Sequence, residues 1–144
     1  MRASAETVVD APPTACFEIL REPSNHPAIV PGLRSIEAEP LDGGGYEGSF
    51  RYRFAGIALE LAFRDVDVDP PRRRAFEVTG ILAGRAVYEL AEENGATRLR
   101  LTITYDLPGP DLLEAALGGL VGRYVERDAE AWVENAKAVI ESGA

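Results

Sequence analysis

Few side chains in this sequence suit acid–base chemistry inside a protein, and the first of them is the only histidine, His26. Imidazole titrates near neutral pH, which makes His26 a candidate general base. Its segment, residues 22–33, holds three prolines and a glycine, so the alternative is a local role in which His26 packs or hydrogen-bonds within a stiff loop. Such a loop suits the border of a cavity, and we expect His26 at the cavity rim.

Asp128 is the second candidate and the stronger one. It lies four residues after Tyr124 and four before Trp132, so a helix would place all three on one apolar stripe. A carboxylate turned into an apolar cavity is desolvated, which raises its pKa and suits it to acid–base work. The alternatives are that the stripe is wider than its buried part, or that Asp128 pairs with an arginine in the cavity.

No other motif with recognisable chemistry is present. Cys16 and His26 are the only residues of their kinds, and neither lies in a motif typical of a nucleophilic triad. We find no metal-ligand spacing and no phosphate-binding glycine loop, so we expect neither a metal nor a cofactor. Tyr52, Tyr88 and Tyr105 share strand faces with apolar residues, where each hydroxyl needs a partner from a ligand, a neighbour or water.

The charge balance argues against several kinds of partner. With 24 acidic and 15 basic residues the formal net charge is −9, so we expect no nucleic-acid partner and no stable membrane insertion. The basic run 72–74 follows two prolines and is predicted to be a solvated turn. One cysteine excludes an internal disulfide, and no signal sequence is recognisable. We therefore expect a cytoplasmic protein, monomeric or homodimeric.

Hydrophobic periodicity predicts the elements that must position these residues. A strand over 5–10 precedes a short helix with prolines in its first turn, and residues 22–33 form a turn plus a helical fragment. Alternation with a period of two then predicts six strands in succession, with a bulge near Arg64–Asp65 where the apolar phase slips. A long helix follows over about 110–142, and its internal glycines allow a bend or a break.

This order predicts a single α+β domain over residues 1–144. A curved antiparallel sheet of about seven strands would wrap around the long C-terminal helix, with two short helices between strands 1 and 2. Each strand has one apolar face to bury, and the long helix is the element available to cover it. The space between sheet and helix is the expected ligand site.

Five short motifs spread over nearly the whole chain are similar to those of one superfamily. They are Val8-Val9-Asp10-Ala11-Pro12-Pro13, Phe17-Glu18-Ile19-Leu20, Pro27-Ala28-Ile29-Val30-Pro31-Gly32, Gly95-Ala96-Thr97-Arg98-Leu99 and Glu134-Asn135-Ala136-Lys137. The chain thereby resembles the START-like or Bet v 1-like superfamily, also called SRPBCC, and within it the polyketide cyclase/dehydrase and coenzyme Q-binding groups. The resemblance implies the helix-grip fold, which hosts carriers, cyclases, plant allergens and regulatory domains.

We predict that this protein binds a hydrophobic or amphipathic small molecule, such as a lipid, an isoprenoid or quinone, or a polyketide-like compound. The predicted cavity walls are Phe50, Tyr52, Phe54, Phe63, Tyr88, Leu101, Ile103 and Tyr105 from the sheet, and Leu113, Leu117, Val121, Tyr124, Asp128 and Trp132 from the helix.

Two alternatives remain open. One is a cyclase or dehydratase acting on a polyketide-like substrate, with Asp128 or His26 as the acid or base. The other, implied by the coenzyme Q-binding resemblance, is a chaperone that binds a partner. A sparse set of candidate catalytic groups does not exclude the enzyme, because one positioned acid or base can suffice, but we favour binding over catalysis.

Overall fold

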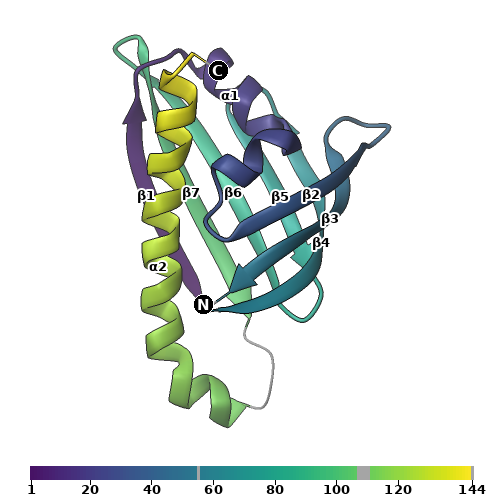
Figure 1. Cartoon of the computed structure of the whole chain (residues 1–144). Helices are drawn as coiled ribbons and strands as arrows, with labels where there is room; N and C mark the ends of the chain where they lie inside the picture. The colour runs from purple at the N-terminus through teal and green to yellow at the C-terminus, as the bar shows by residue number, and fades with distance from the viewer. Residues whose placement is uncertain (55, 107–110, 144) are drawn as a thin grey trace.

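The computed structural model describes residues 1–54, 56–106 and 111–143, with the side chains of all of these except 111–120. Its elements in chain order are β1 (Arg2–Val9), α1 (Pro13–Arg21), the 3-10 helix η1 (Pro23–Ala28), β2 (Leu33–Pro40), β3 (Tyr46–Phe54), β4 (Ile57–Asp69), β5 (Arg73–Thr79), β6 (Ala83–Glu93), β7 (Ala96–Asp106) and α2 (Asp111–Glu141). Figure 1 shows the sheet with α2 along one side of it and the two short helices near the end of α2. The predicted helix-grip fold is confirmed.

The sheet has seven strands in the order β1-β7-β6-β5-β4-β3-β2, and each neighbouring pair is antiparallel. Strands β2 to β7 are neighbours in sequence and in space, as hairpin connections require. The first strand pairs with the last, so that Ala5 lies opposite Leu101. The long helix α2 packs over this β1–β7 pair, where it covers the inner face of the sheet.

The period-two pattern sets which side chains enter the core. In β7, Leu99 and Leu101 are buried and the alternate residues Arg98 and Arg100 are exposed. The bulge predicted near residues 64–65 is present in β4, where the register shifts between Asp65 and Asp67.

The short helices close the end of the sheet beside α2. α1 begins at Pro13, where a missing N–H costs nothing, and buries Phe17 and Leu20. Asn25 of η1 donates its side-chain N–H to the Ile19 carbonyl at 3.0 Å. The Asn135 amide of α2 donates to the Ile29 carbonyl at 3.0 Å, so η1 is fixed between α1 and α2.

The helix α2 is continuous from Asp111 to Glu141, without a break at its glycines. On the described part of the helix, the apolar stripe that faces the sheet is Val125, Ala129, Trp132, Val133, Ala136 and Ile140. No described helix is both long and apolar enough to cross a membrane.

Candidate ligand-binding cavity

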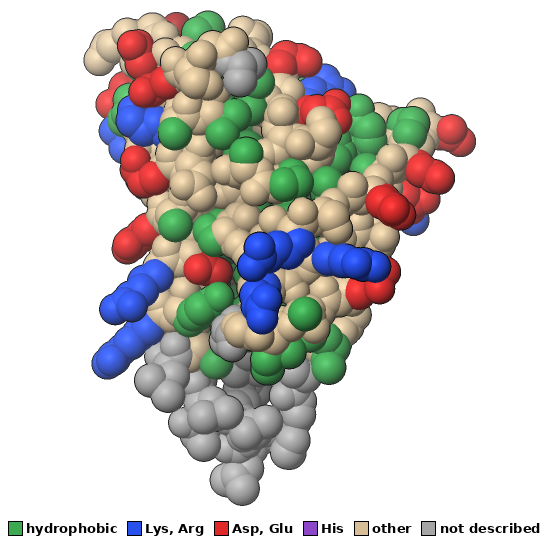
Figure 2. Space-filling view, viewed as in Figure 1, with side chains coloured by type: hydrophobic (Ala, Val, Ile, Leu, Met, Phe, Trp, Pro, Cys, Tyr) green, Lys and Arg blue, Asp and Glu red, His purple; other side chains and the backbone are tan. Residues whose placement is uncertain are grey.

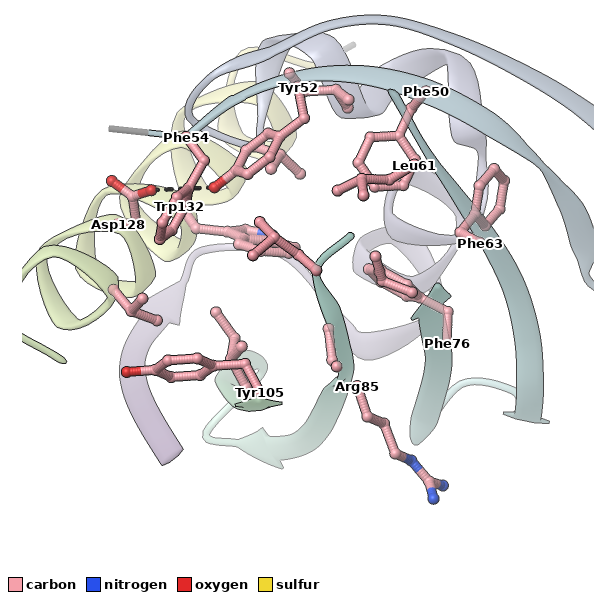
Figure 3. A pocket seen from close by; sticks show the side chains of 18 of the residues that line it. Phe50, Tyr52, Phe54, Leu61, Phe63, Phe76, Arg85, Tyr105, Asp128 and Trp132 are labelled. Atoms are coloured by element: carbon pink, nitrogen blue, oxygen red, sulfur yellow. Dashed lines mark hydrogen bonds between the residues drawn. The ribbon is translucent and has the colours of Figure 1, made fainter. Parts of the chain in front are cut away.

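A cavity of about 150 Å³ lies between the inner face of the sheet, the segment that follows η1, and α2 (Figure 3). Most of its lining is apolar. The described residues that line it are His26, Val30, Pro31, Leu33, Ile36, Phe50, Tyr52, Phe54, Leu61, Phe63, Arg74, Phe76, Val78, Leu82, Ala83, Gly84, Arg85, Ala86, Ile103, Thr104, Tyr105, Asp106, Val125, Asp128 and Trp132.

Aromatic rings form a continuous arc along one wall of this cavity. They come from inward-facing positions of three adjacent strands and from α2. Neighbouring ring centroids lie 6.2–6.4 Å apart along the series Phe54, Tyr52, Phe50, Phe63, Phe76 and Trp132. These separations are typical of favourable aromatic pairs. The arc is therefore a packed wall, and the cavity is bounded by ring faces and edges.

The structure brings many of the predicted wall residues to the cavity. Those that line it are Phe50, Tyr52, Phe54, Phe63, Ile103, Tyr105, Asp128 and Trp132. Leu101 and Tyr88 do not line it, and both are fully buried in the hydrophobic core. Val121 and Tyr124 pack against the core beside the cavity, and the ring of Tyr124 contacts Phe54 at 5.2 Å. The side chains of Leu113 and Leu117 lie outside the described residues. The ligand-binding role of the whole set stays a prediction.

Sequence reasoning missed several of the lining residues, and two groups of them carried a recognisable signal. Val30, Pro31, Leu33 and Ile36 come from the segment after η1 and the start of β2. The sequence pattern could have predicted them, since an apolar, proline-rich segment beside a cavity must bury its own apolar side chains. Phe76 and Val78 alternate correctly for the inner face of β5, so the same period-two rule that selected Phe63 applies to them.

His26 lies in the protein interior and not at the rim, which corrects our expectation. It is 3% exposed. Its Nδ1 lies 3.1 Å from the Glu22 carbonyl, which can only accept, so Nδ1 carries the proton. Its Nε2 is then the acceptor for Arg74 Nη1 at 3.0 Å and for the Tyr88 hydroxyl at 3.2 Å. Neither ring nitrogen is left free for a ligand.

The environment of His26 keeps its ring neutral. Burial, and then the positive charge of Arg74, lower the pKa of His26 to about 3, against the opposing effect of the hydrogen bond that His26 donates to the Glu22 carbonyl. The Tyr88 hydroxyl that donates to His26 accepts from Trp132 Nε1 at 2.7 Å. Burial raises the pKa of Tyr88 to about 12. A chain of hydrogen bonds thus joins η1, β5, β6 and α2 through side chains that are each satisfied.

Arg74 is also buried, although the run 72–74 was expected to be solvated. Its side chain is 2% exposed and forms an ion pair with Asp65, whose side chain is equally buried, at 2.8 Å. Asp65 accepts a second bond from the Tyr46 backbone N–H at 2.8 Å, and Arg74 donates to the Leu20 carbonyl at 2.8 Å. The expectation failed because Arg74 shares the inner face of β5 with Phe76, and Asp65, which lies opposite Phe76 on β4, supplies its partner there.

Asp128 lies at the cavity and is half-buried, as its place on the helical stripe predicted. The Tyr52 hydroxyl donates to its Oδ2 at 3.4 Å (Figure 3). Burial raises the pKa of Asp128 above its ordinary value, and the Tyr52 bond opposes that shift. Burial and the neighbouring Asp128 together raise the pKa of Tyr52, which remains protonated. The alternative of a cavity arginine as partner is not realised, since Asp128 has no ion pair within the described part of the chain.

A cluster of basic residues lies on the outer surface of β2 and β3. Arg34, Arg51 and Arg53 are exposed on β2 and β3, and Figure 2 shows basic side chains gathered over that region. Among the described residues, no group of three or more His, Cys, Asp and Glu side chains is placed to hold a metal ion. The site is therefore an apolar cavity with one carboxylate–phenol pair in its wall.

A curved antiparallel sheet that closes on a long C-terminal helix around such a cavity defines the helix-grip fold. The sequence matches the family described as "Polyketide cyclase / dehydrase and lipid transport" over residues 1–141, and the chain belongs to this family. No curated protein matches the sequence.

Solved structures of the same fold cover almost the entire chain. A protein of Thermus thermophilus, TTHA0849, has a TM-score of 0.88 at 18% identity, over 100% of this chain and 99% of its own. The Zhui aromatase/cyclase of Streptomyces sp. R1128 has a TM-score of 0.80 at 19% identity, over 98% and 93%. Ara h 8.0201 has a TM-score of 0.67 at 17% identity, over 99% and 98%. At these identities the likeness concerns the fold alone.

Proposed function

We propose that this protein binds a hydrophobic or amphipathic small molecule in the cavity between the sheet and α2. The observation that carries the proposal is a cavity of about 150 Å³ whose wall is an arc of aromatic side chains with aliphatic residues around it. Membership of a family whose description includes lipid transport supports the same class of ligand. A cytoplasmic location and a monomeric or homodimeric state are further predictions, testable by fractionation and size-exclusion chromatography.

The size of the cavity bounds the expected affinity. An apolar cavity of this volume holds a molecule the size of benzene. Burying roughly 150 Å² of ring surface at about 25 cal/mol per Å² is worth about 4 kcal/mol, which corresponds to a Kd of about 1 mM. A longer natural ligand gains affinity by extending beyond this ring-sized space or by widening it.

One observation favours a second function, that of a cyclase or dehydratase. The carboxyl group of Asp128, with its pKa raised by burial, hydrogen-bonds a phenol inside an apolar cavity, which is an arrangement suited to general acid–base catalysis. A solved structure of the same fold is titled an aromatase/cyclase. Multiple turnovers of a polyketide-like substrate, abolished in Asp128→Asn while the substrate still binds, would support this function. Binding without turnover would support the carrier.

The test of binding uses the only tryptophan of the chain as its reporter, because Trp132 lies in the cavity wall. We expect toluene and phenol to change Trp132 fluorescence saturably in the millimolar range. Ala86 is 4% exposed and lines the cavity, so Ala86→Leu should fill space and weaken both probes about tenfold or more.

The matched control is Ala91→Leu on the same strand. Ala91 is exposed on the other face of β6, so this variant should bind both probes as the wild type does. Equal weakening by the two variants, or a fluorescence change that never saturates, would refute binding in the cavity. If binding in the cavity is confirmed, native mass spectrometry of freshly purified protein would identify the natural ligand.

A further inference from the structure

The polar groups in the cavity wall differ in how far their hydrogen-bonding capacity is used. His26, Arg74 and Trp132 line the cavity, yet each side-chain nitrogen already has a partner within the protein. A ligand could bond to them only by breaking a bond of the buried network. Breaking such a bond costs about what the new bond would contribute. These three residues therefore offer a ligand no unpaired hydrogen-bonding group.

The carboxylate of Asp128 can accept more hydrogen bonds than it does. An ionised carboxylate can accept about four hydrogen bonds. Within the described part of the chain, Asp128 accepts one, from Tyr52, at a distance of 3.4 Å that is long for an O–H···O bond. It also has no cation as partner among the described residues. Figure 3 shows its carboxylate beside Phe54 and Tyr52, at the Phe54 end of the aromatic arc.

The remaining polar side chains of the wall do not compete with Asp128 for this role. Figure 3 shows the guanidinium group of Arg85 pointing away from the aromatic arc. Thr104 and Asp106 are exposed on the outer face of β7. Tyr105 carries a neutral hydroxyl that can both donate and accept, so it selects for neither kind of ligand group. The under-used carboxylate is thus the polar group of the wall that prefers a hydrogen-bond donor.

We propose that Asp128 determines the specificity of the cavity by selecting neutral, ring-sized ligands that carry a hydroxyl donor, that is phenols, and by rejecting carboxylates. The apolar ring packs on the aromatic arc, and the ligand hydroxyl donates to the free oxygen of Asp128. A hydrogen bond to a charged acceptor is worth more than one between neutral groups. A ligand carboxylate would instead place a second negative charge beside Asp128, which has no ion pair with a described cation. This inference rests on the proposed binding function.

The experiment compares phenol with toluene, since the two differ only by a hydroxyl in place of a methyl group, and adds benzoate as the anionic probe. The quantity measured is the ratio of the toluene Kd to the phenol Kd, from Trp132 fluorescence. Asp128→Leu should lower this ratio about tenfold, because it removes the acceptor and keeps the same branched arrangement of heavy atoms. Asp128→Asn keeps the shape and loses the charge, so it should lower the ratio less. Both variants should bind benzoate more tightly than the wild type does.

Glu130→Leu is the control, because it removes a carboxylate from the exposed face of the same helix, two residues away. It should leave the ratio and the benzoate affinity unchanged. If Asp128→Leu fails to fold, Asp128→Asn decides the question alone. Probes that bind the wild type and are excluded by Ala86→Leu, with a ratio that stays constant in the Asp128 variants, would overturn the specificity while leaving the cavity function intact. Probes that do not bind the wild type would overturn both.

Discussion

At the scale of single residues, the described part of the interior contains a network of mutually satisfied polar groups around the buried ion pair of Arg74 and Asp65. Arg74 and Asp65 are each 2% exposed, and His26 accepts from Arg74 where water would otherwise be needed. Burying charges is costly, and it is tolerated only when partners replace the lost hydration. The network therefore makes the stability of the fold depend on pH and on each of its members.

The neutral state of His26 predicts a specific pH dependence of stability. The pKa of His26 is about 3 in the folded protein and about 6.5 when unfolded, so only the unfolded chain takes up this proton between those values. The contribution is fully present above pH 6.5 and is lost as the pH falls toward 3. Between pH 7 and pH 5 the free energy of unfolding should fall by about 2 kcal/mol on this account.

Urea unfolding of the wild type and of His26→Gln at both pH values isolates this contribution. The carboxylates titrate in both proteins, so the difference between their pH dependences belongs to His26. The wild type should lose about 2 kcal/mol more than the variant does. Equal losses in the two proteins would show that His26 is not held neutral.

The buried ion pair predicts different costs for two adjacent arginines. Arg74→Met leaves the Asp65 carboxylate buried without its cation and should cost about 3–5 kcal/mol. Arg73 pairs with Asp67 at 3.1 Å, but its side chain is 45% exposed, so Arg73→Met should cost less than about 1 kcal/mol. Chemical unfolding of the two variants makes the comparison. Similar costs for both would argue that Arg74 is solvated.

At the scale of elements, the connection from η1 to β2 decides where the cavity wall runs. Gly32 follows Val30 and Pro31, both in the wall, and its φ of +81° belongs to the left-handed region that favours glycine. Its carbonyl accepts from the Arg53 backbone N–H at 2.8 Å, which docks the turn onto the end of β3. The turn thus needs both the unusual φ and the absence of a side chain.

A glycine series separates these two requirements. An alanine Cβ at position 32 would lie 2.5 Å from the Arg53 carbonyl oxygen, whereas Gly95, with a φ of +85°, has open space around it. Gly95→Ala should cost about 1 kcal/mol from the left-handed backbone alone. Gly32→Ala should cost at least twice as much and should also alter probe binding. Gly43→Ala, with neither constraint, should be neutral in thermal unfolding. Equal effects at positions 32 and 95 would show that the turn tolerates a side chain.

At the scale of the whole molecule, the cavity is a packing defect that a ligand can repair. Well-packed interiors contain few voids larger than a water molecule, so about 150 Å³ between sheet and helix lowers the stability of the unliganded protein. A ligand that binds only the folded state adds stability through its binding free energy. Stability and binding are therefore coupled through the same space.

This coupling predicts a concentration-dependent Tm. Phenol at ten times its Kd should add about 1.4 kcal/mol, and it should raise the Tm by about 3–6 °C. Ala86→Leu should abolish that increase because it occupies the space itself. Thermal unfolding followed by circular dichroism measures both. A Tm that phenol lowers equally in the wild type and in Ala86→Leu would indicate that phenol acts as a denaturant and not as a ligand.

Most of the architecture could be predicted because periodicity is a local property of the chain. The alternation in β3 and β7 and the 3.6-residue stripe of α2 state which faces must be buried, and the order of the elements leaves few ways to bury them. The placement of Asp128 on the buried stripe followed from its spacing to Tyr124 and Trp132 alone. The bulge in β4 was visible as a slip in the apolar phase.

The sequence by itself thus determined the elements, their inner faces and the existence of a space between sheet and helix. Only the tertiary structure decided which polar residues have their hydrogen-bonding groups paired inside the protein. His26, Arg74, Asp65, Tyr88 and Trp132 lie on five different elements, and no periodicity predicts that they meet. Hydrogen bonding depends on distances between segments far apart in the chain. For that reason the sequence could not predict that His26 lies in the buried hydrogen-bond network and not at the cavity rim. Nor could it predict that Asp128 accepts a single hydrogen bond among the described residues.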